Sequence, residues 1–185
     1  MEFAPTAIPD VKVIVPKKFG DHRGFFSEVF RKDSFAKAGI DCEFVQDNHS
    51  LSAAAGVVRG LHWQIGNAAQ HKLVRVLKGA ILDVAVDIRR KSPTFGKHVV
   101  IELSDENWKQ IFVPIGFAHG FATLTPNTEV VYKVSKYYSP NDERGLRWND
   151  PALGVDWRIK QGEATLSDRD EKHPLFADLP SDWLF

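Results

Sequence analysis

The sequence has one cysteine and no long apolar run among its 185 residues. The lone Cys42 cannot form an internal disulfide, and no other Cys or His lies near it at the spacing of a zinc site. We therefore interpret Cys42 as a small apolar residue of the structure. Every apolar stretch falls short of the roughly 20 residues that a membrane-spanning helix needs, so we expect no membrane partner.

The chain also lacks an excess of charge of either sign. Its 24 Lys and Arg residues balance 24 Asp and Glu residues, and the charges alternate along the chain without blocks. No global positive field therefore attracts nucleic acid, and we expect no nucleic-acid partner. Any anionic ligand must be small and locally bound. The first residues lack the pattern of a secretory signal, so the expected location is the cytoplasm.

The length and composition fit one globular domain. A hydrophobic fraction of 43% and a charged fraction of 26% are ordinary for such a domain. We predict a single domain over residues 1–185, with a β core over about residues 8–138. An irregular C-terminal segment, residues 139–185, is expected to pack on this core through Trp148, Trp157 and Trp183.

Short runs of alternating or β-branched residues recur between turn signals, and they predict strands. Many short strands at this spacing are typical of an all-β sandwich or barrel. One short helix is predicted over Ser34–Ala38, with Asp33 as its N-cap and Gly39 at its C-terminal end. The predicted strands are residues 11–15, 25–30, 44–46, 57–62, 73–77, 81–88, 99–103, 111–113, 121–124 and 130–134.

The segment Arg59-Gly60-Leu61-His62 places a cation and a titratable imidazole beside a glycine that permits close backbone approach. Histidine titrates near neutral pH, so His62 is a candidate general base; the alternative is a histidine that makes only a structural hydrogen bond. Arg59 and His62 have opposite parity on a regular strand. Both side chains reach one pocket only through a β-bulge near Gly60, or by contacting different parts of a ligand.

Further candidates lie elsewhere along the chain. Alternation places Lys72 on a strand face that also carries valines, where its ammonium either extends to solvent or points into a pocket. Tyr132 lies on a similar valine-lined face and needs one partner for its hydroxyl if it is buried. His119 occupies a predicted turn within residues 114–121, and Asp170 lies in a polar turn of the C-terminal segment.

The histidines do not have the spacing of a cupin metal site. Such sites take two histidines one residue apart and a nearby carboxylate, so that alternate strand positions face one ion. The position two residues after His62 is Gln64, and His71 lies in a connecting loop. We therefore predict no metal site, although the sequence leaves open that His49, His62, His71 and His119 converge in space.

Eight motifs occur in one order along most of the chain: residues 20–26 (GDHRGFF), 45–50 (VQDNHS), 59–62 (RGLH), 72–75 (KLVR), 83–89 (DVAVDIR), 116–121 (GFAHGF), 137–140 (YYSP) and 148–150 (WND). Together they resemble the dTDP-4-dehydrorhamnose 3,5-epimerase family, and the resemblance extends over about residues 8–170. It implies a double-stranded β-helix, that is, a cupin-like jelly roll with short peripheral helices. It also implies a homodimer that uses no metal or organic cofactor.

The resemblance implies a role for each of four candidates. His62 would be the base that removes a proton from the substrate, and Asp170 would hold its imidazole in the required tautomer. Lys72 would face the C4 oxygen of the sugar. Tyr132 would be the acid that delivers a proton from the opposite face.

A second set of positions would bind the nucleotide sugar. Tyr138 would stack on the thymine, and Arg169 stands where lysine is also familiar in the family. The other binding positions that the resemblance implies are Arg23, Glu28, Gln46, Asn48, Arg59, His119 and Glu143.

The implied reaction is epimerisation at C3 and C5 of dTDP-4-dehydro-6-deoxyglucose, in the synthesis of dTDP-rhamnose. The alternatives are a relative that inverts only C3 or only C5, or a ketoisomerase of another dTDP-deoxysugar. Outside this group stand a metal-dependent cupin oxygenase and a non-catalytic sugar-binding β domain.

Overall fold

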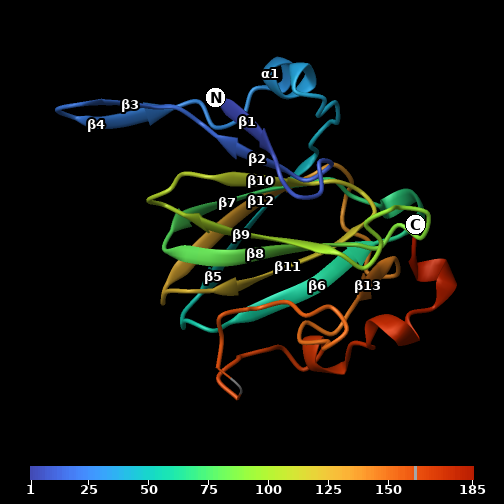
Figure 1. Ribbon diagram of the computed structural model, residues 1–185. Coiled ribbons are helices and arrows are strands. Elements are labelled where there is room, and N and C mark those ends of the chain that lie inside the picture. Colours follow the sequence, from blue (N-terminus) through green and yellow to red (C-terminus); the bar gives the residue numbers. More distant parts are fainter. Residues whose placement is uncertain (161) are drawn as a thin grey trace.

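Two sheets stacked face to face make up the body of the protein (Figure 1). The computed structural model describes residues 1–160 and 162–185. The six-stranded sheet has the order β1-β2-β10-β7-β12-β5, and the five-stranded sheet has the order β13-β6-β11-β8-β9. Neighbouring strands in both sheets are antiparallel. This arrangement confirms the predicted all-β, cupin-like jelly roll.

The strands are short, and only brief helices accompany them. The strands are β1 Glu2–Pro5, β2 Lys12–Val15, β3 Lys18–Asp21, β4 Gly24–Ser27, β5 Gln46–Ser52, β6 Val58–Gln64, β7 Lys72–Lys78, β8 Ala80–Asp87, β9 His98–Ser104, β10 Gln110–Val113, β11 Phe117–Thr123, β12 Thr128–Val134 and β13 Glu143–Gly145. The helix α1 spans Lys32–Lys37, and the 3₁₀ turns are η1 Gly66–Ala68, η2 Asp170–Lys172, η3 Phe176–Asp178 and η4 Ser181–Trp183. None of the helices in the described ranges is long and apolar enough to cross a membrane.

The main hydrophobic core lies between the two sheets. Val74 and Val76 of β7 belong to the same buried cluster as Ile81 of β8 and Phe121 of β11. Tyr132 of β12 packs against this cluster. The faces predicted from alternation for the runs around Lys72 and Tyr132 are therefore correct, and both residues approach the space between the sheets.

The C-terminal segment covers the outer face of the five-stranded sheet. Figure 1 shows this orange and red segment beneath β6 and β13. Trp157 is buried there, and the indole Nε1 of Trp63 donates to the carbonyl oxygen of Trp183 at 2.8 Å. The segment is less irregular than predicted, because residues 143–145 form β13 and pair with β6. A strand of three residues gives too short an alternation to detect in a sequence.

Two sequence-based assignments near the site are wrong. Residues 46–52 form β5, of which only the first was predicted as strand, because its inward side chains Gln46, Asn48 and Ser50 are polar and give no apolar alternation. His119 lies inside the buried strand β11 and not in a turn. Gly116 and Gly120 flank it, but only Gly116 has a positive φ, of 91°.

The helix α1 begins at Lys32, two residues before the predicted start at Ser34. Asp33 does not act as its N-cap, because its carboxylate instead accepts from the Arg31 guanidinium at 2.7 and 3.0 Å. The predicted end is correct: Gly39 follows the helix with a φ of 78°.

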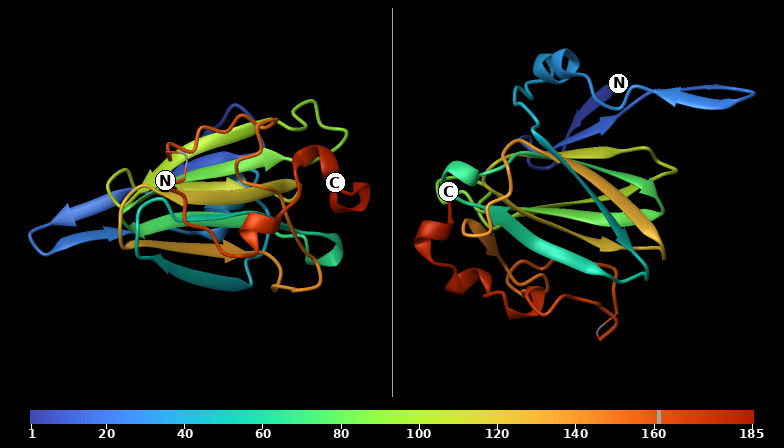
Figure 2. Two further views of the ribbon diagram at one scale, coloured as in Figure 1. Left: turned by 90° about the horizontal axis from the view of Figure 1, so that it is seen from below. Right: turned by 180° about the vertical axis from the view of Figure 1, so that it is seen from behind.

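The hairpin formed by β3 and β4 projects away from the two stacked sheets (Figures 1 and 2). Three of its phenylalanines are exposed: Phe19 by 54%, Phe25 by 56% and Phe26 by 69%. Exposed aromatic side chains gathered on one projecting element typically mark an interaction surface.

Candidate active site

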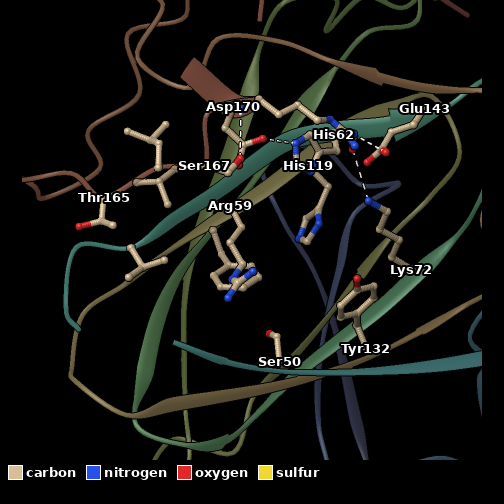
Figure 3. Close-up of a pocket in the computed structure, with 15 residues that line it drawn as sticks. Ser50, Arg59, His62, Lys72, His119, Tyr132, Glu143, Thr165, Ser167 and Asp170 are labelled. Atoms are coloured by element: carbon tan, nitrogen blue, oxygen red, sulfur yellow. Dashed lines mark hydrogen bonds and ion pairs between the residues drawn. The ribbon is translucent and has the colours of Figure 1, made fainter. Parts of the chain in front are cut away.

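A cavity of about 490 Å³ opens between the two sheets and is bordered by the C-terminal segment (Figure 3). A second cavity of about 230 Å³ adjoins it, and His62, Lys72, Tyr132 and Glu143 line both. Together they have the size of an ordinary small-molecule site. The residues of the larger cavity come from β5, from β6 and the preceding Val57, from β7, β11, β12 and β13, and from residues 165–167, 169 and 170.

A bulge in β6 turns Arg59 and His62 toward the same cavity. His62 pairs with His119 and Arg59 pairs with Phe121, so two residues of β6 face the single Gly120 of β11. A Cβ at Gly60 would lie 2.7 Å from the Cα of Gly120, so only glycine permits this approach. Of the two alternatives that the sequence left open for Arg59 and His62, the structure has the bulge near Gly60.

His62 forms a short hydrogen bond with Asp170. Its Nε2 lies 2.6 Å from Asp170 Oδ1, although 108 residues separate the two in the chain. Their side chains are only 25% and 6% exposed. Because the carboxylate accepts a proton from Nε2, the neutral imidazole keeps its lone pair on Nδ1. Burial lowers the pKa of His62 while Asp170 opposes this shift, so the ring is a neutral base at neutral pH.

Asp170 is anchored at the start of η2, where its backbone N–H donates to Ser167 Oγ at 3.2 Å. Burial opposes ionisation, but the imidazoles of His173 and His62 hold the pKa of the Asp170 carboxyl well below its usual range. The carboxylate is therefore charged throughout the neutral range.

Lys72 presents an ammonium group to the cavity from β7. Its Nζ donates to the backbone oxygen of His62 at 3.3 Å, and no carboxylate among the described residues forms an ion pair with it. Burial lowers the pKa of Lys72 to about 8, partly opposed by the charges of Glu143 and Asp83. The ammonium is thus a cation held beside the base at neutral pH.

Tyr132 faces His62 from the other sheet, the one that also carries Lys72. It belongs to β12 of the six-stranded sheet, whereas His62 belongs to β6 of the five-stranded sheet, and Figure 3 shows the two on opposite sides of the cavity. Burial raises the pKa of the Tyr132 phenol, with Arg59 opposing, so the hydroxyl carries its proton. The cavity therefore holds a base on one wall and a proton donor on the other.

His119 is fixed by a carboxylate that the sequence analysis missed. Its Nε2 lies 3.0 Å from both oxygens of Asp83, which is fully buried on β8. Asp83 lies on the same strand face as Ile81 and Ala85, which belong to the core. The sequence held one signal for this partner: Asp83 is an acidic residue between apolar residues of one strand face. A carboxylate buried in that position needs a hydrogen-bonding or charged partner.

Polar side chains gather at the mouth of the smaller cavity. Gln46 donates to Asn48 at 2.8 Å and accepts from the backbone N–H of Tyr138 at 3.2 Å. The Tyr138 hydroxyl donates to Glu143 at 2.6 Å, and Glu143 also pairs with Arg169. Burial alone would raise the pKa of the Glu143 carboxyl. The contacts with Arg169 and Tyr138 outweigh this effect, so the net pKa of Glu143 is lowered.

Two predicted binding residues lie away from both cavities. Arg23 lies in the turn between β3 and β4, where its side chain is 78% exposed and pairs with Asp21. Glu28 is exposed just after β4. Neither lines the site of its own chain.

The histidines converge only in part. His62 and His119 line the cavity, whereas His49 pairs with Glu129 on the exposed face of β5 and His71 Nδ1 accepts from the backbone of Ile115. A histidine outside the predicted set, His173, lies 3.4 Å from Asp170. His173 directly follows the 3₁₀ turn η2, and no pattern in the sequence indicates that this residue contacts Asp170.

Comparisons with known proteins agree with this geometry. A sequence model of the family described as dTDP-4-dehydrorhamnose 3,5-epimerase matches residues 5–178. The chain is 53% identical over 180 residues to the dTDP-4-dehydrorhamnose 3,5-epimerase of Sinorhizobium fredii, with 97% of this chain and 92% of the relative covered.

Solved structures show the same similarity. The dTDP-6-deoxy-D-glucose-3,5-epimerase of Legionella pneumophila, in complex with dTDP-4-keto-L-rhamnose, superposes with a TM-score of 0.94 at 43% identity, over 99% of this chain and 96% of the other. A 3'-monoepimerase of Streptomyces bikiniensis, in complex with dTDP-quinovose, gives a TM-score of 0.87 at 36% identity, over 94% and 87%. The chain belongs to the dTDP-4-dehydrorhamnose 3,5-epimerase family and is an isomerase.

Proposed function

We propose that the cavity converts dTDP-4-dehydro-6-deoxy-D-glucose into dTDP-4-dehydro-L-rhamnose by inverting C3 and C5, a step of dTDP-rhamnose biosynthesis. The observation that carries this proposal is the placement of the His62–Asp170 pair and Tyr132 on opposite sheets, with the Lys72 ammonium beside them. Single-domain folding over residues 1–185 and a cytoplasmic location remain predictions.

His62 removes the proton next to the C4 ketone. Its lowered pKa keeps the imidazole neutral, and the hydrogen bond to Asp170 leaves the lone pair on Nδ1. When Nδ1 takes up the proton, the ring becomes a cation beside the Asp170 carboxylate, which stabilises it. A positioned base of this kind contributes about 10²- to 10⁴-fold to the rate.

Lys72 stabilises the enolate that forms on the C4 oxygen. A fixed cation in a site that excludes most water needs no reorganisation when charge develops, so it is worth more there than in bulk water. The same burial that lowers the Lys72 pKa to about 8 makes the group able to share its proton with an enolate oxygen.

Tyr132 returns a proton from the other face. Inversion of a carbon centre requires removal and return on opposite sides of the sugar ring, and one group cannot do both. Tyr132 keeps its proton because burial raises its pKa, and it projects from the sheet opposite to that of His62.

The remaining cavity residues bind the nucleotide. Arg59 and Arg169 offer planar guanidinium groups that donate in pairs to phosphate oxygens. Gln46, Asn48 and His119 offer further polar contacts, and Tyr138, 48% exposed, offers a ring on which the thymine stacks. Glu143 contacts both Arg169 and the Tyr138 hydroxyl, and so orients the two groups that would meet the nucleotide.

The proton-transfer test is deuterium exchange. Protein is incubated with dTDP-4-dehydro-6-deoxyglucose in deuterium oxide, and C3 and C5 are followed by NMR. Exchange and inversion at both carbons support the proposal, and exchange at one carbon selects a single-site epimerase, the activity named for the Streptomyces relative. Absence of exchange at both carbons, with protein that remains folded, refutes it.

We further propose that the functional unit is a homodimer in which the β3–β4 hairpin completes the partner's site. Arg23 and Glu28 lie on or beside the hairpin that projects from the two sheets (Figure 1), and neither lines the cavities of its own chain. The exposed Phe19, Phe25 and Phe26 supply an apolar surface for a second copy.

A mixing experiment tests this dimer. In this proposal, the Arg23→Ala and His62→Ala homodimers are both inactive. In a heterodimer, the Arg23→Ala chain supplies an intact His62 and the His62→Ala chain supplies an intact Arg23 to the same site, so one of the two sites is complete. Random reassortment of the two variants then restores about a quarter of the wild-type activity. If Arg23 acts within its own chain, mixing restores none.

A further inference from the structure

His173 is a buried histidine that the proposed reaction does not use. Its side chain is 12% exposed, and its Nε2 is buried without a hydrogen-bond partner among the described residues. Burying a polar atom without a partner is unfavourable, so a bound atom that pairs with this nitrogen would remove an energetic cost. It lies 3.4 Å from Oδ1 of Asp170, and the ring stands edge-on to that of His62 with 5.3 Å between centroids.

The surroundings hold the His173 ring in this place. Gly145 has no side chain where a Cβ would lie only 2.1 Å from the imidazole, so the glycine leaves room for the ring. Arg147 holds the backbone of His173 and of the next residue: its N–H donates to the oxygen of Pro174 at 2.9 Å, and its Nε donates to the oxygen of His173 at 3.3 Å. The ring is therefore preorganised beside Asp170.

The ligand atoms of His62, Asp170 and His173 all lie within 4.8 Å of one another. Two imidazoles and one carboxylate form a common zinc ligand set, with bonds of about 2.0–2.2 Å and a fourth position left open. Two such ligands at a tetrahedral angle are about 3.3 Å apart, close to the 3.4 Å between His173 and Asp170. The 2.6 Å contact of His62 with Asp170 would open by about 0.7 Å to admit the ion.

We propose that His62, Asp170 and His173 form an inhibitory transition-metal site that takes Zn²⁺. The ion bonds to Nε2 of His62 in place of the proton that this nitrogen shares with Asp170. The proton displaced from Nε2 is taken up by Nδ1 through solvent, so the metal-bound ring stays neutral with its N–H on Nδ1 and has no lone pair to accept a proton from the sugar. Bound Zn²⁺ and an active base thus exclude each other. The inhibition rests on the proposed role of His62, whereas the binding does not.

Binding is tested without turnover by titrating the folded protein with Co²⁺, whose visible absorption reports tetrahedral coordination. We expect one Co²⁺ per chain, displaced by Zn²⁺, and an affinity at least about tenfold lower in His173→Gln. His173→Cys, which supplies a thiolate ligand, restores the binding. The matched control is His49→Gln, which removes an imidazole paired with Glu129 outside the cavity and leaves the binding unchanged.

Inhibition is measured on the same proteins, each relative to its own activity without metal. Zn²⁺ inhibits the wild type and His49→Gln reversibly, a chelator restores activity, and His173→Gln requires at least about tenfold more Zn²⁺. Mg²⁺ has no effect, because it prefers oxygen ligands. Absence of Co²⁺ binding by the wild type, or equal binding by His173→Gln, overturns the site. Binding that leaves activity intact overturns the inhibition and contradicts the role of His62 as the base.

Discussion

Asp170→Asn is the substitution that isolates the orientation of the base. Asparagine keeps the size of the side chain and an acceptor oxygen, but it removes the charge that stabilises the imidazolium formed on His62. The contact is short, at 2.6 Å, and both side chains are largely buried, at 25% and 6% exposure, so solvent does not screen it strongly.

The expected loss follows from the strength of such a contact. A hydrogen bond to a charged group is worth about 1.5–3 kcal/mol, and each 1.4 kcal/mol is about tenfold in rate. Asp170→Asn therefore lowers kcat by about 10- to 150-fold. KM changes little, since Asp170 contacts the base and not the sugar. An amide that turns its NH₂ toward His62 selects the wrong tautomer and enlarges the loss.

Steady-state kinetics of the two-site inversion measure this effect, with binding of dTDP as the check that the cavity is intact. Asp168→Asn is the matched control, because Asp168 is an exposed acid two residues away and its loss leaves kcat within about twofold. Activity of Asp170→Asn within about twofold of the wild type would refute the assignment of Asp170 as the partner that orients the base.

Four further outcomes are expected. On the acid side, kcat/KM falls only below the ordinary histidine range, because the His62 pKa is lowered and the ring takes up a proton there. On the alkaline side, kcat/KM falls above about 8, where Lys72 loses its proton. Lys72→Arg moves this alkaline fall to higher pH, and an unchanged alkaline fall contradicts the assignment of Lys72. Tyr132→Phe keeps deuterium exchange detectable while inversion falls about 10²- to 10⁴-fold, and equal loss of both events argues against the division of roles. Prolonged treatment with a chelator leaves activity unreduced, whereas loss reversed by iron or manganese would support a metal-dependent reaction. Gly60→Ala destabilises the fold by about 1–3 kcal/mol, measured by thermal unfolding, while Gly66→Ala, which meets no atom within 4 Å, costs less.

The sequence predicted those strands whose inner face is apolar. Alternation placed Lys72 and Tyr132 on the correct faces because their neighbours are valines of the core. The same criterion failed for β5, whose inner face is polar because it lines the cavity. The sequence pattern also placed His119 in a turn and not in a strand, because Gly116 and Gly120, which flank it, are residues typical of turns. Among the strands that build the site, β5 and β11 thus carry the weakest pattern, whereas β7 and β12 were predicted from their valines.

The site itself was predictable in its parts but not in its assembly. The parity of Arg59 and His62 left either a bulge or contacts with different parts of a ligand, and the structure has a bulge at Gly60. No spacing rule connects His62 with Asp170, 108 residues away, so that pair came only from the resemblance to the family. Asp83 and His173 act through contacts that only the folded chain brings together. Arg23 and Glu28 remain outside the cavity, so their assignment depends on the proposed dimer.

The two members of the His62–Asp170 pair lie in parts of the chain that are held in different ways. His62 lies in an interior strand of a sheet, whereas Asp170 lies in a turn outside both sheets, in a segment attached by side-chain packing and by separate hydrogen bonds such as that from Trp63 to Trp183. Local opening of that segment would separate the pair while both sheets stay folded. Catalytic competence is then lost at a lower temperature or denaturant concentration than the barrel itself, and amide protons around residue 170 exchange before those of β6.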